Sequence, residues 1–122
     1  MLIAAVGGIW SLGFYLQQRH SEDARFLKEL MSEFISRYNE LNGPLQTAIL
    51  SGEEFSKEAR LKFIDYFNLC AEEHVFWKIG YIDDSIWDAW RSGMTYYGRD
   101  PRGRELWKSE RGPSYYGFDL PE

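Results

Sequence analysis

Cysteine and histidine are scarce in this chain, which has one cysteine and two histidines among 122 residues. The lone cysteine, Cys70, cannot form an internal disulfide and fits a reducing compartment. No Cys/His spacing matches a structural zinc site, and no stretch carries an enzyme signature. We therefore expect a protein without catalytic activity and without a cofactor.

Basic residues are also fewer than acidic ones. The chain has 14 lysines and arginines and 19 aspartates and glutamates, which gives a net charge of −5. A nucleic-acid binder needs a basic surface for its phosphate contacts, so we expect no nucleic-acid partner. Repeats and low-complexity tracts are lacking too. The chain does have apolar surface, with 44% hydrophobic and 17% aromatic residues. That is enough for one folded domain.

Charge is missing altogether from residues 1–16, MLIAAVGGIWSLGFYL. As a helix these residues would span roughly 24 Å, and residues 1–18 about 27 Å. A hydrocarbon core about 30 Å thick accepts such a short span with thinning or snorkelling. We interpret residues 1–18 as a membrane anchor in contact with lipid. Two alternatives stay open: a helix buried in a homo- or hetero-oligomer, and a signal peptide, although neither a basic start nor a small-residue cleavage site is visible.

Small residues four apart recur in the anchor and would let two such helices pack closely. They are Ala4, Gly7, Gly8 and Ser11. Basic residues follow the anchor and none precedes it; these are Arg19, Arg25 and Lys28. By the positive-inside rule we expect a single-pass protein of the cell membrane, with its body on the cytoplasmic side.

A helical domain is predicted for residues 19–111. Its first helix, over residues 21–42, has an apolar stripe at spacings of four and three, formed by Leu27, Met31, Phe34, Tyr38 and Leu41. We expect this helix to continue directly from the anchor as one rod, and its stripe to bind a protein partner or a second copy. Asn42-Gly43-Pro44 should end it, because glycine accepts the left-handed cap conformation and proline interrupts the hydrogen-bond ladder.

The next part of the domain is predicted to hold a short helix over residues 44–50 and then a long one that ends near residue 79. Ser51 and Glu54 have the spacing of a capping box for the long helix. Gly80 would close it, with Tyr81 placed to contact Phe76.

The last two helices are predicted to begin at aspartate caps. Asp83 would cap a helix that ends at Gly98, and Asp100 followed by Pro101 would open a short helix to about residue 110. Residues 112–122 have no period and are predicted to form an extended tail. No strand pattern is present, so the sequence predicts an all-α fold, a small helical bundle with a long N-terminal helix.

Two groups of side chains invite a metal or catalytic interpretation. Cys70 and His74 lie four apart on one helical face, but two ligands do not make a metal site, and a buried thiol beside a core or boundary histidine explains them. Glu72 and Glu73 precede His74, yet neighbouring residues on a helix point in different directions. General acid–base chemistry needs groups that converge on one substrate atom, so we expect no such site here.

Other charged and aromatic residues also have ordinary explanations. Asp83 and Asp84 suit helix capping better than metal binding. A basic cluster late in the chain fits a solvated helix face, with contact to anionic headgroups as the alternative. It comprises Arg99, Arg102, Arg104, Lys108 and Arg111. The tail aromatics Tyr115, Tyr116 and Phe118 are expected to dock on the protein's own core rather than on a partner.

Residues 66–90, YFNLCAEEHVFWKIGYIDDSIWDAW, resemble small uncharacterised bacterial proteins that look like an N-terminal membrane segment followed by a helical cytoplasmic domain. The likeness lies in the turn Gly80-Tyr81-Ile82-Asp83 and in a later tryptophan within a basic–acidic helix, here Trp107. It covers most of residues 1–110. The matching residues are caps and core, so the resemblance implies an architecture and no activity or site residue.

Three functional hypotheses follow, in order of preference. The first is a membrane-anchored helical interaction or scaffold protein without catalytic activity. The second is a soluble helical binding module whose apolar N-terminal helix packs in an oligomer. The third is an enzyme that uses Glu72, Glu73 and His74, which would require a pocket lined by all three side chains.

Overall fold

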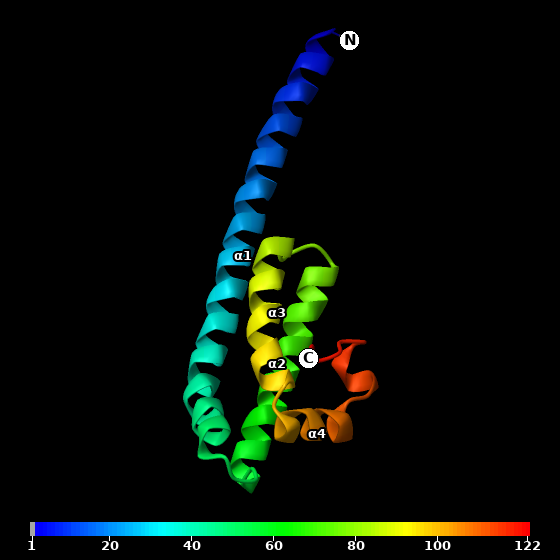
Figure 1. Cartoon of the computed structure of the whole chain (residues 1–122). Coiled ribbons are helices and arrows are strands. Elements are labelled where there is room, and N and C mark those ends of the chain that lie inside the picture. Colours follow the sequence, from blue (N-terminus) through cyan, green and yellow to red (C-terminus); the bar gives the residue numbers. More distant parts are fainter. Residues whose placement is uncertain (1) are drawn as a thin grey trace. The chain divides into compact units, whose positions relative to one another are not determined.

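The computed structural model describes the backbone of residues 2–122 and the side chains of residues 22–122. The elements are α1 (Leu2–Ser51), α2 (Lys57–Lys78), α3 (Asp84–Gly98), α4 (Pro101–Glu110) and the short 3-10 helix η1 (Pro113–Tyr115) (Figure 1). No strand occurs in the described backbone, which confirms the predicted all-α class. The chain divides into two compact units, residues 1–33 and residues 34–122.

The predicted anchor lies outside the residues whose side chains are described. The same holds for the candidate packing residues Ala4, Gly7, Gly8 and Ser11. Within residues 22–122, none of the helices combines the length and the apolar character that crossing a membrane requires. Between residues 22 and 33, α1 exposes almost all of its charged side chains to solvent.

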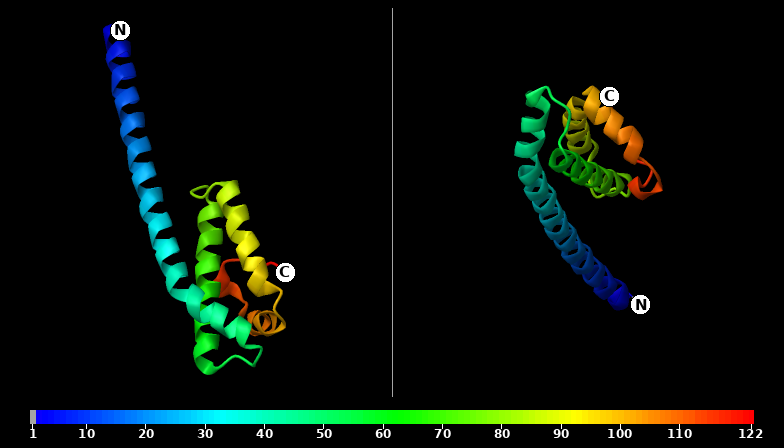
Figure 2. Two further views of the ribbon diagram at one scale, coloured as in Figure 1. Left: turned by 60° about the vertical axis from the view of Figure 1, so that its left-hand side comes forward. Right: turned by 90° about the horizontal axis from the view of Figure 1, so that it is seen from below.

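The predicted helix end at Asn42-Gly43-Pro44 is wrong, because α1 continues through Pro44 to Ser51. Gly43 does not take the left-handed conformation; Gly52 does, with φ of +69°. Tertiary contacts hold the helix together on either side of the proline, since Leu41 and Leu45 are both buried. The ribbon of α1 bends in this region (Figure 2), as expected where proline removes one backbone hydrogen bond.

The start of α2 also differs from the prediction. The expected capping box of Ser51 and Glu54 does not form, because the Ser51 hydroxyl donates to the Ala48 carbonyl at the end of α1. Ser56 caps α2 instead, and its side chain accepts from the backbone N–H of Ala59 at 3.1 Å. Ser51 and Ser56 both have a side chain suited to an N-cap. Ser56 caps α2 because α1 extends as far as Ser51.

The remaining helix ends follow the predictions. Gly80, at φ of +90°, closes α2, and the N–H of Tyr81 donates to the Phe76 carbonyl while the two rings meet edge-on. Asp83 caps α3 by accepting from the N–H of Ser85 at 2.8 Å. Asp100 caps α4 with Pro101 in the first turn. These ends were predictable because each one depends on residues within six positions of each other.

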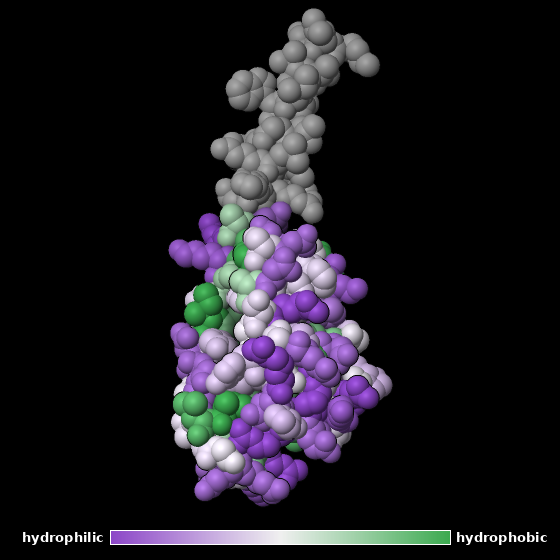
Figure 3. Space-filling view, viewed as in Figure 1, coloured by the Kyte–Doolittle hydropathy of each residue, from purple (hydrophilic) through white to green (hydrophobic). Residues whose placement is uncertain are grey.

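Residues 34–122 share one aromatic core. In this unit α2 contacts α3, α4 and η1, and α3 contacts α4 (Figures 1 and 2). Trp107 of α4 is fully buried at its centre, with ring centroids 5.2 Å from Phe67 and 5.6 Å from Phe118. On the face shown in Figure 3, the surface over residues 22–122 is mostly polar with small apolar patches.

The C-terminal residues dock on this core, which corrects the prediction of a wholly extended tail. Pro113–Tyr115 forms η1, and Tyr115 and Phe118 are buried as expected, whereas Tyr116 is 65% exposed. Arg104 fixes the chain end, because its guanidinium donates to the carbonyls of Gly98, Leu120 and Pro121 at 2.8–2.9 Å.

Candidate functional site

A cavity of about 240 Å³ lies between α1 and α3, with α2 at its base. Its walls are apolar and aromatic apart from a single carboxyl group. The lining residues are Phe34, Ile35 and Tyr38 from α1, Tyr66 and Glu73 from α2, and Ala89, Trp90, Gly93 and Met94 from α3. Such a concave apolar site with one polar group is the usual form of a small-molecule pocket.

The base of the cavity is inaccessible to bulk solvent and its rim is open. Phe34, Tyr66 and Met94 are each at most 3% exposed. Ile35 is half exposed, and Gly93 lies on the surface with open space where a side chain would begin. A ligand would therefore enter between α1 and α3 and reach the α2 side chains last.

Glu73 is the buried charged residue of the described core, with 7% of its surface exposed. Burial raises the pKa of its carboxyl to about 8, against the opposing effect of Arg37 and with a smaller contribution from Glu72. Desolvation favours the neutral acid because the ion loses its hydration on burial. At neutral pH the cavity is thus lined by a protonated, neutral carboxylic acid.

The three residues of the predicted acid–base group point to three different surroundings. Glu72 forms an ion pair with Arg37 at the surface of the bundle, with the nitrogen and oxygen 2.5 Å apart. Glu73 lines the cavity. His74 lies among aromatic rings, with centroids 5.5 Å from both Trp87 and Phe118. They share no common target atom, so the arrangement does not supply the convergence that acid–base catalysis requires.

Cys70 and His74, the other pair considered as metal ligands, lie in different surroundings. Cys70 is fully buried, and its thiol lies beside Tyr66 and Glu73, where burial raises the thiol pKa. Burial and the nearby Lys78 lower the pKa of His74, and its Nδ1 has no hydrogen-bond partner within the described residues. No group of three metal-ligating side chains is found among residues 22–122.

The acidic pair that follows α2 has structural partners for both members. Asp83 caps α3, as described above. Asp84 accepts a hydrogen bond from the indole Nε1 of Trp77 at 2.8 Å. This contact links the last turn of α2 to the first turn of α3.

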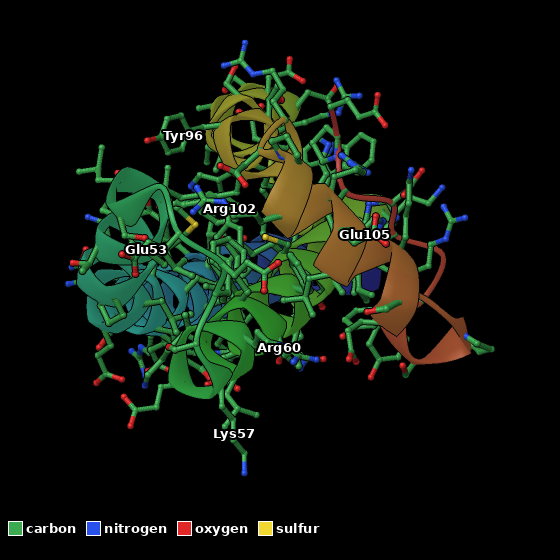
Figure 4. The ribbon with its side chains drawn as sticks, turned by 60° about the horizontal axis from the view of Figure 1, so that its bottom comes forward. Glu53, Lys57, Arg60, Tyr96, Arg102 and Glu105 are labelled. Atoms are coloured by element: carbon green, nitrogen blue, oxygen red, sulfur yellow. The ribbon has the colours of Figure 1, made fainter. Side chains whose placement is uncertain are left out.

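Two members of the basic cluster are held in structural contacts. Arg104 binds the C-terminal carbonyls, and Arg102 reaches from α4 to the end of α1 (Figure 4). The Arg102 guanidinium donates to the carbonyls of Ala48, Ile49 and Glu53 and is paired with Asp100. Arg99, Lys108 and Arg111 remain exposed, so only these three are available to an anionic surface.

The predicted partner stripe of α1 is largely occupied by the protein itself. Phe34 and Leu41 are buried at 2% and 7% exposure, so neither is available to a partner. Leu27 and Met31 are half-buried, and Tyr38 is 36% exposed at the cavity rim. The accessible part of the predicted stripe is therefore Tyr38 together with the half-buried Leu27 and Met31.

The cavity was not predicted from the sequence. Its residues come from three helices, and its one local signal is the i, i+4, i+7 series Tyr66, Cys70 and Glu73 on α2. That series places a carboxyl on a helix face that is otherwise aromatic and apolar. Arg102 was missed as a cap because the carbonyls it binds lie about fifty residues away.

Comparison of the chain with protein-family models, with curated proteins and with solved structures finds no match in any of the three.

Proposed function

We propose that this protein is a membrane-anchored helical binding protein without catalytic activity, held at the cytoplasmic face of the cell membrane by residues 1–18. The observation that carries the proposal is the uncharged stretch of residues 1–16, which no turn signal separates from the sequence that follows it in α1. A charged residue at the centre of a membrane helix costs about 2.5–3.5 kcal/mol, so an uncharged run of this length favours insertion.

The body supports a binding role rather than a catalytic one. The cavity between α1, α2 and α3 is lined mainly by apolar and aromatic side chains, and Glu73 is its acidic residue. The neighbouring Glu72 and His74 point elsewhere, as shown by the surface ion pair of the first and the aromatic surroundings of the second. A lone carboxyl in an apolar cavity can orient a ligand, but it has no partner for proton relay or nucleophilic attack.

The basic residues after the anchor support the cytoplasmic placement of the body. Arg19, Arg25 and Lys28 follow the uncharged stretch at distances of about one to three helical turns. Arg25 and Lys28 are exposed on α1. Their positions are those of juxtamembrane charges that attract anionic lipid.

Membrane fractionation of the full chain tests the anchor. Wild type is expected in the membrane fraction after a high-salt wash and in solution only with detergent. Gly8→Arg places a charge at the centre of the uncharged run and should release much of the protein, whereas the matched Gln18→Arg, at the end of the run, should not. Recovery of wild type in the soluble fraction without detergent would instead favour the oligomer helix.

Self-association is tested on the same material. The small residues at positions 4, 7, 8 and 11 are expected to support anchor–anchor packing, so Gly7→Leu should weaken cross-linked dimers in detergent. Gly13→Leu, in the same segment but outside this set, is the matched control. Equal dimer yields in both variants would remove these residues from any packing role.

A further inference from the structure

The Glu73 carboxyl is a buried acid without a counter-charge in direct contact. The attraction of Arg37 lowers the pKa of the carboxyl by less than burial raises it. The one nearby cation, Arg37, is paired with Glu72. An ionised carboxyl in such a place is unfavourable by several kcal/mol unless a partner reaches it. Arg37 offsets this cost only in part.

The cavity walls around Glu73 are suited to a cation. Four aromatic side chains line the space, Phe34, Tyr38, Tyr66 and Trp90. They do not fill it by stacking, since the Phe34–Trp90 rings meet edge-on at 5.9 Å and the Tyr38–Tyr66 rings are tilted at 6.3 Å. Aromatic faces attract ammonium groups, and this attraction is strongest where water is excluded.

Other ligand classes fit less well. An anion would oppose the ionisation of Glu73, and a metal ion would find one carboxyl group where it needs several ligands. A purely apolar molecule would leave the carboxyl as isolated as it is in the empty cavity. The volume, about 240 Å³, is below the roughly 300–1,000 Å³ of pockets for drug-sized ligands and therefore suits a small molecule.

From this combination we propose that the cavity between α1, α2 and α3 binds a small organic ammonium ion, with Glu73 as its counter-charge and Phe34, Tyr38, Tyr66 and Trp90 as its aromatic walls. The apolar part of the ligand would lie toward the rim, where Ile35 and Ala89 line the opening. The site is in the body of the protein, so this proposal does not depend on the membrane anchor.

Binding of a cation at this site should release a proton. Burial raises the pKa of Glu73 to about 8, so the empty site holds the neutral acid at pH 7 and the ammonium ion needs the carboxylate. Below pH 8 the affinity should therefore increase about tenfold for each unit by which the pH rises, and above pH 8 it should level off.

No other group around the cavity accounts for such a profile. From α1 the charged or titratable neighbours are Arg37 and Tyr38, and from α2 they are Tyr66, Cys70 and Glu72. Burial raises the pKa of Tyr66 and of Cys70, so both remain neutral. The lining residues from α3 are not titratable.

Isothermal titration calorimetry on the full chain in a non-ionic detergent tests the proposal. The probes are n-butylammonium and butyltrimethylammonium chloride, with 1-butanol as the uncharged comparison and detergent alone as the blank. Both cations should bind at least about tenfold more tightly than the alcohol. Titrations at pH 7 in buffers of different ionisation enthalpy should report the release of about one proton per cation bound.

Three variants make the test specific to the cavity. Glu73→Gln should lose cation binding and proton release, and Asp65→Asn, an exposed acid on the same helix, should bind as wild type does. Gly93→Leu should block the rim without clashing, because nothing lies within 4 Å of its Cβ position. Equal affinity for 1-butanol, unchanged cation binding in Glu73→Gln, or an equal loss in Asp65→Asn would each overturn the proposal.

Discussion

The buried Glu73 should make the protein less stable as the pH rises. Its carboxyl has a pKa of about 8 in the folded protein, raised from 4.5 by burial. Between these two values the folded state holds a proton that the unfolded state has released. The free energy of unfolding therefore falls with increasing pH across this window, and the fall is complete once the pH passes about 8.

The magnitude follows from the two pKa values. Each pKa unit is worth about 1.36 kcal/mol, so the window from 4.5 to about 8 carries a ceiling of roughly 5 kcal/mol. Between pH 5 and pH 9 the expected loss is about 4 kcal/mol, because part of the fall has occurred by pH 5. This loss is a large share of the 5–15 kcal/mol that is typical for a whole domain.

Urea unfolding of the full chain at pH 5 and pH 9, followed by near-ultraviolet circular dichroism, measures the effect. Glu73→Gln removes the titrating group while keeping the side-chain shape, so its free energy of unfolding should change much less between the two pH values. Asp65→Asn, exposed on the same helix, should follow the wild-type profile. Parallel profiles for wild type and Glu73→Gln would refute the reasoning, because another group would then cause the pH dependence.

Substitutions at two glycines of α3 should have opposite effects. Gly93→Ala should raise the free energy of unfolding by roughly 0.5–1 kcal/mol, since its added Cβ meets open space and glycine weakens a helix interior. Gly98→Ala should lower the free energy of unfolding, because the added Cβ would lie 1.8 Å from the Pro121 carbonyl oxygen. It should also expose the C-terminal residues to carboxypeptidase. Equal stability of the two variants would contradict this packing. Arg102→Lys keeps the positive charge but loses the planar guanidinium that donates to the carbonyls at the end of α1. Its melting temperature should therefore fall below that of Arg99→Lys, a matched substitution at an exposed arginine. Equal melting temperatures would show that Arg102 does not stabilise the end of α1.

The helix ends show what could be predicted from the sequence. Gly80, Asp83 and Asp100 act where the sequence placed them, because each cap involves residues close together in the chain. Gly43-Pro44 carries an equally strong stop signal and is overridden. The difference is tertiary: the side chains around the proline are buried or bonded to α3, as in the hydrogen bond from Gln46 to the Tyr97 hydroxyl. A local signal yields when contacts from distant residues outweigh it.

The candidate site could not be predicted from the sequence alone. Glu72 and Glu73 are chemically identical neighbours, and nothing in their local sequence tells which one is buried. A rotation of about 100° per residue on the helix sends the first to Arg37 at the surface and the second into the cavity. The distinction needs the position of α1, whose residues lie 35 or more positions away. Helical periodicity could place Glu73 on the face of Tyr66 and Cys70, but not show that this face borders an open space.

The position of Glu73 in the cavity indicates why this residue is a glutamate. An unpaired buried acid lowers stability, and an apolar side chain of similar volume in its place would be expected to stabilise the bundle. The fold therefore does not need Glu73, in contrast to Arg102 or Arg104, whose removal would leave backbone carbonyls unsatisfied. A group that the fold does not need, aimed into a cavity that the fold does not fill, is best explained by a molecule that enters from outside. Because that molecule must meet a buried carboxyl surrounded by aromatic rings, its charge should be positive.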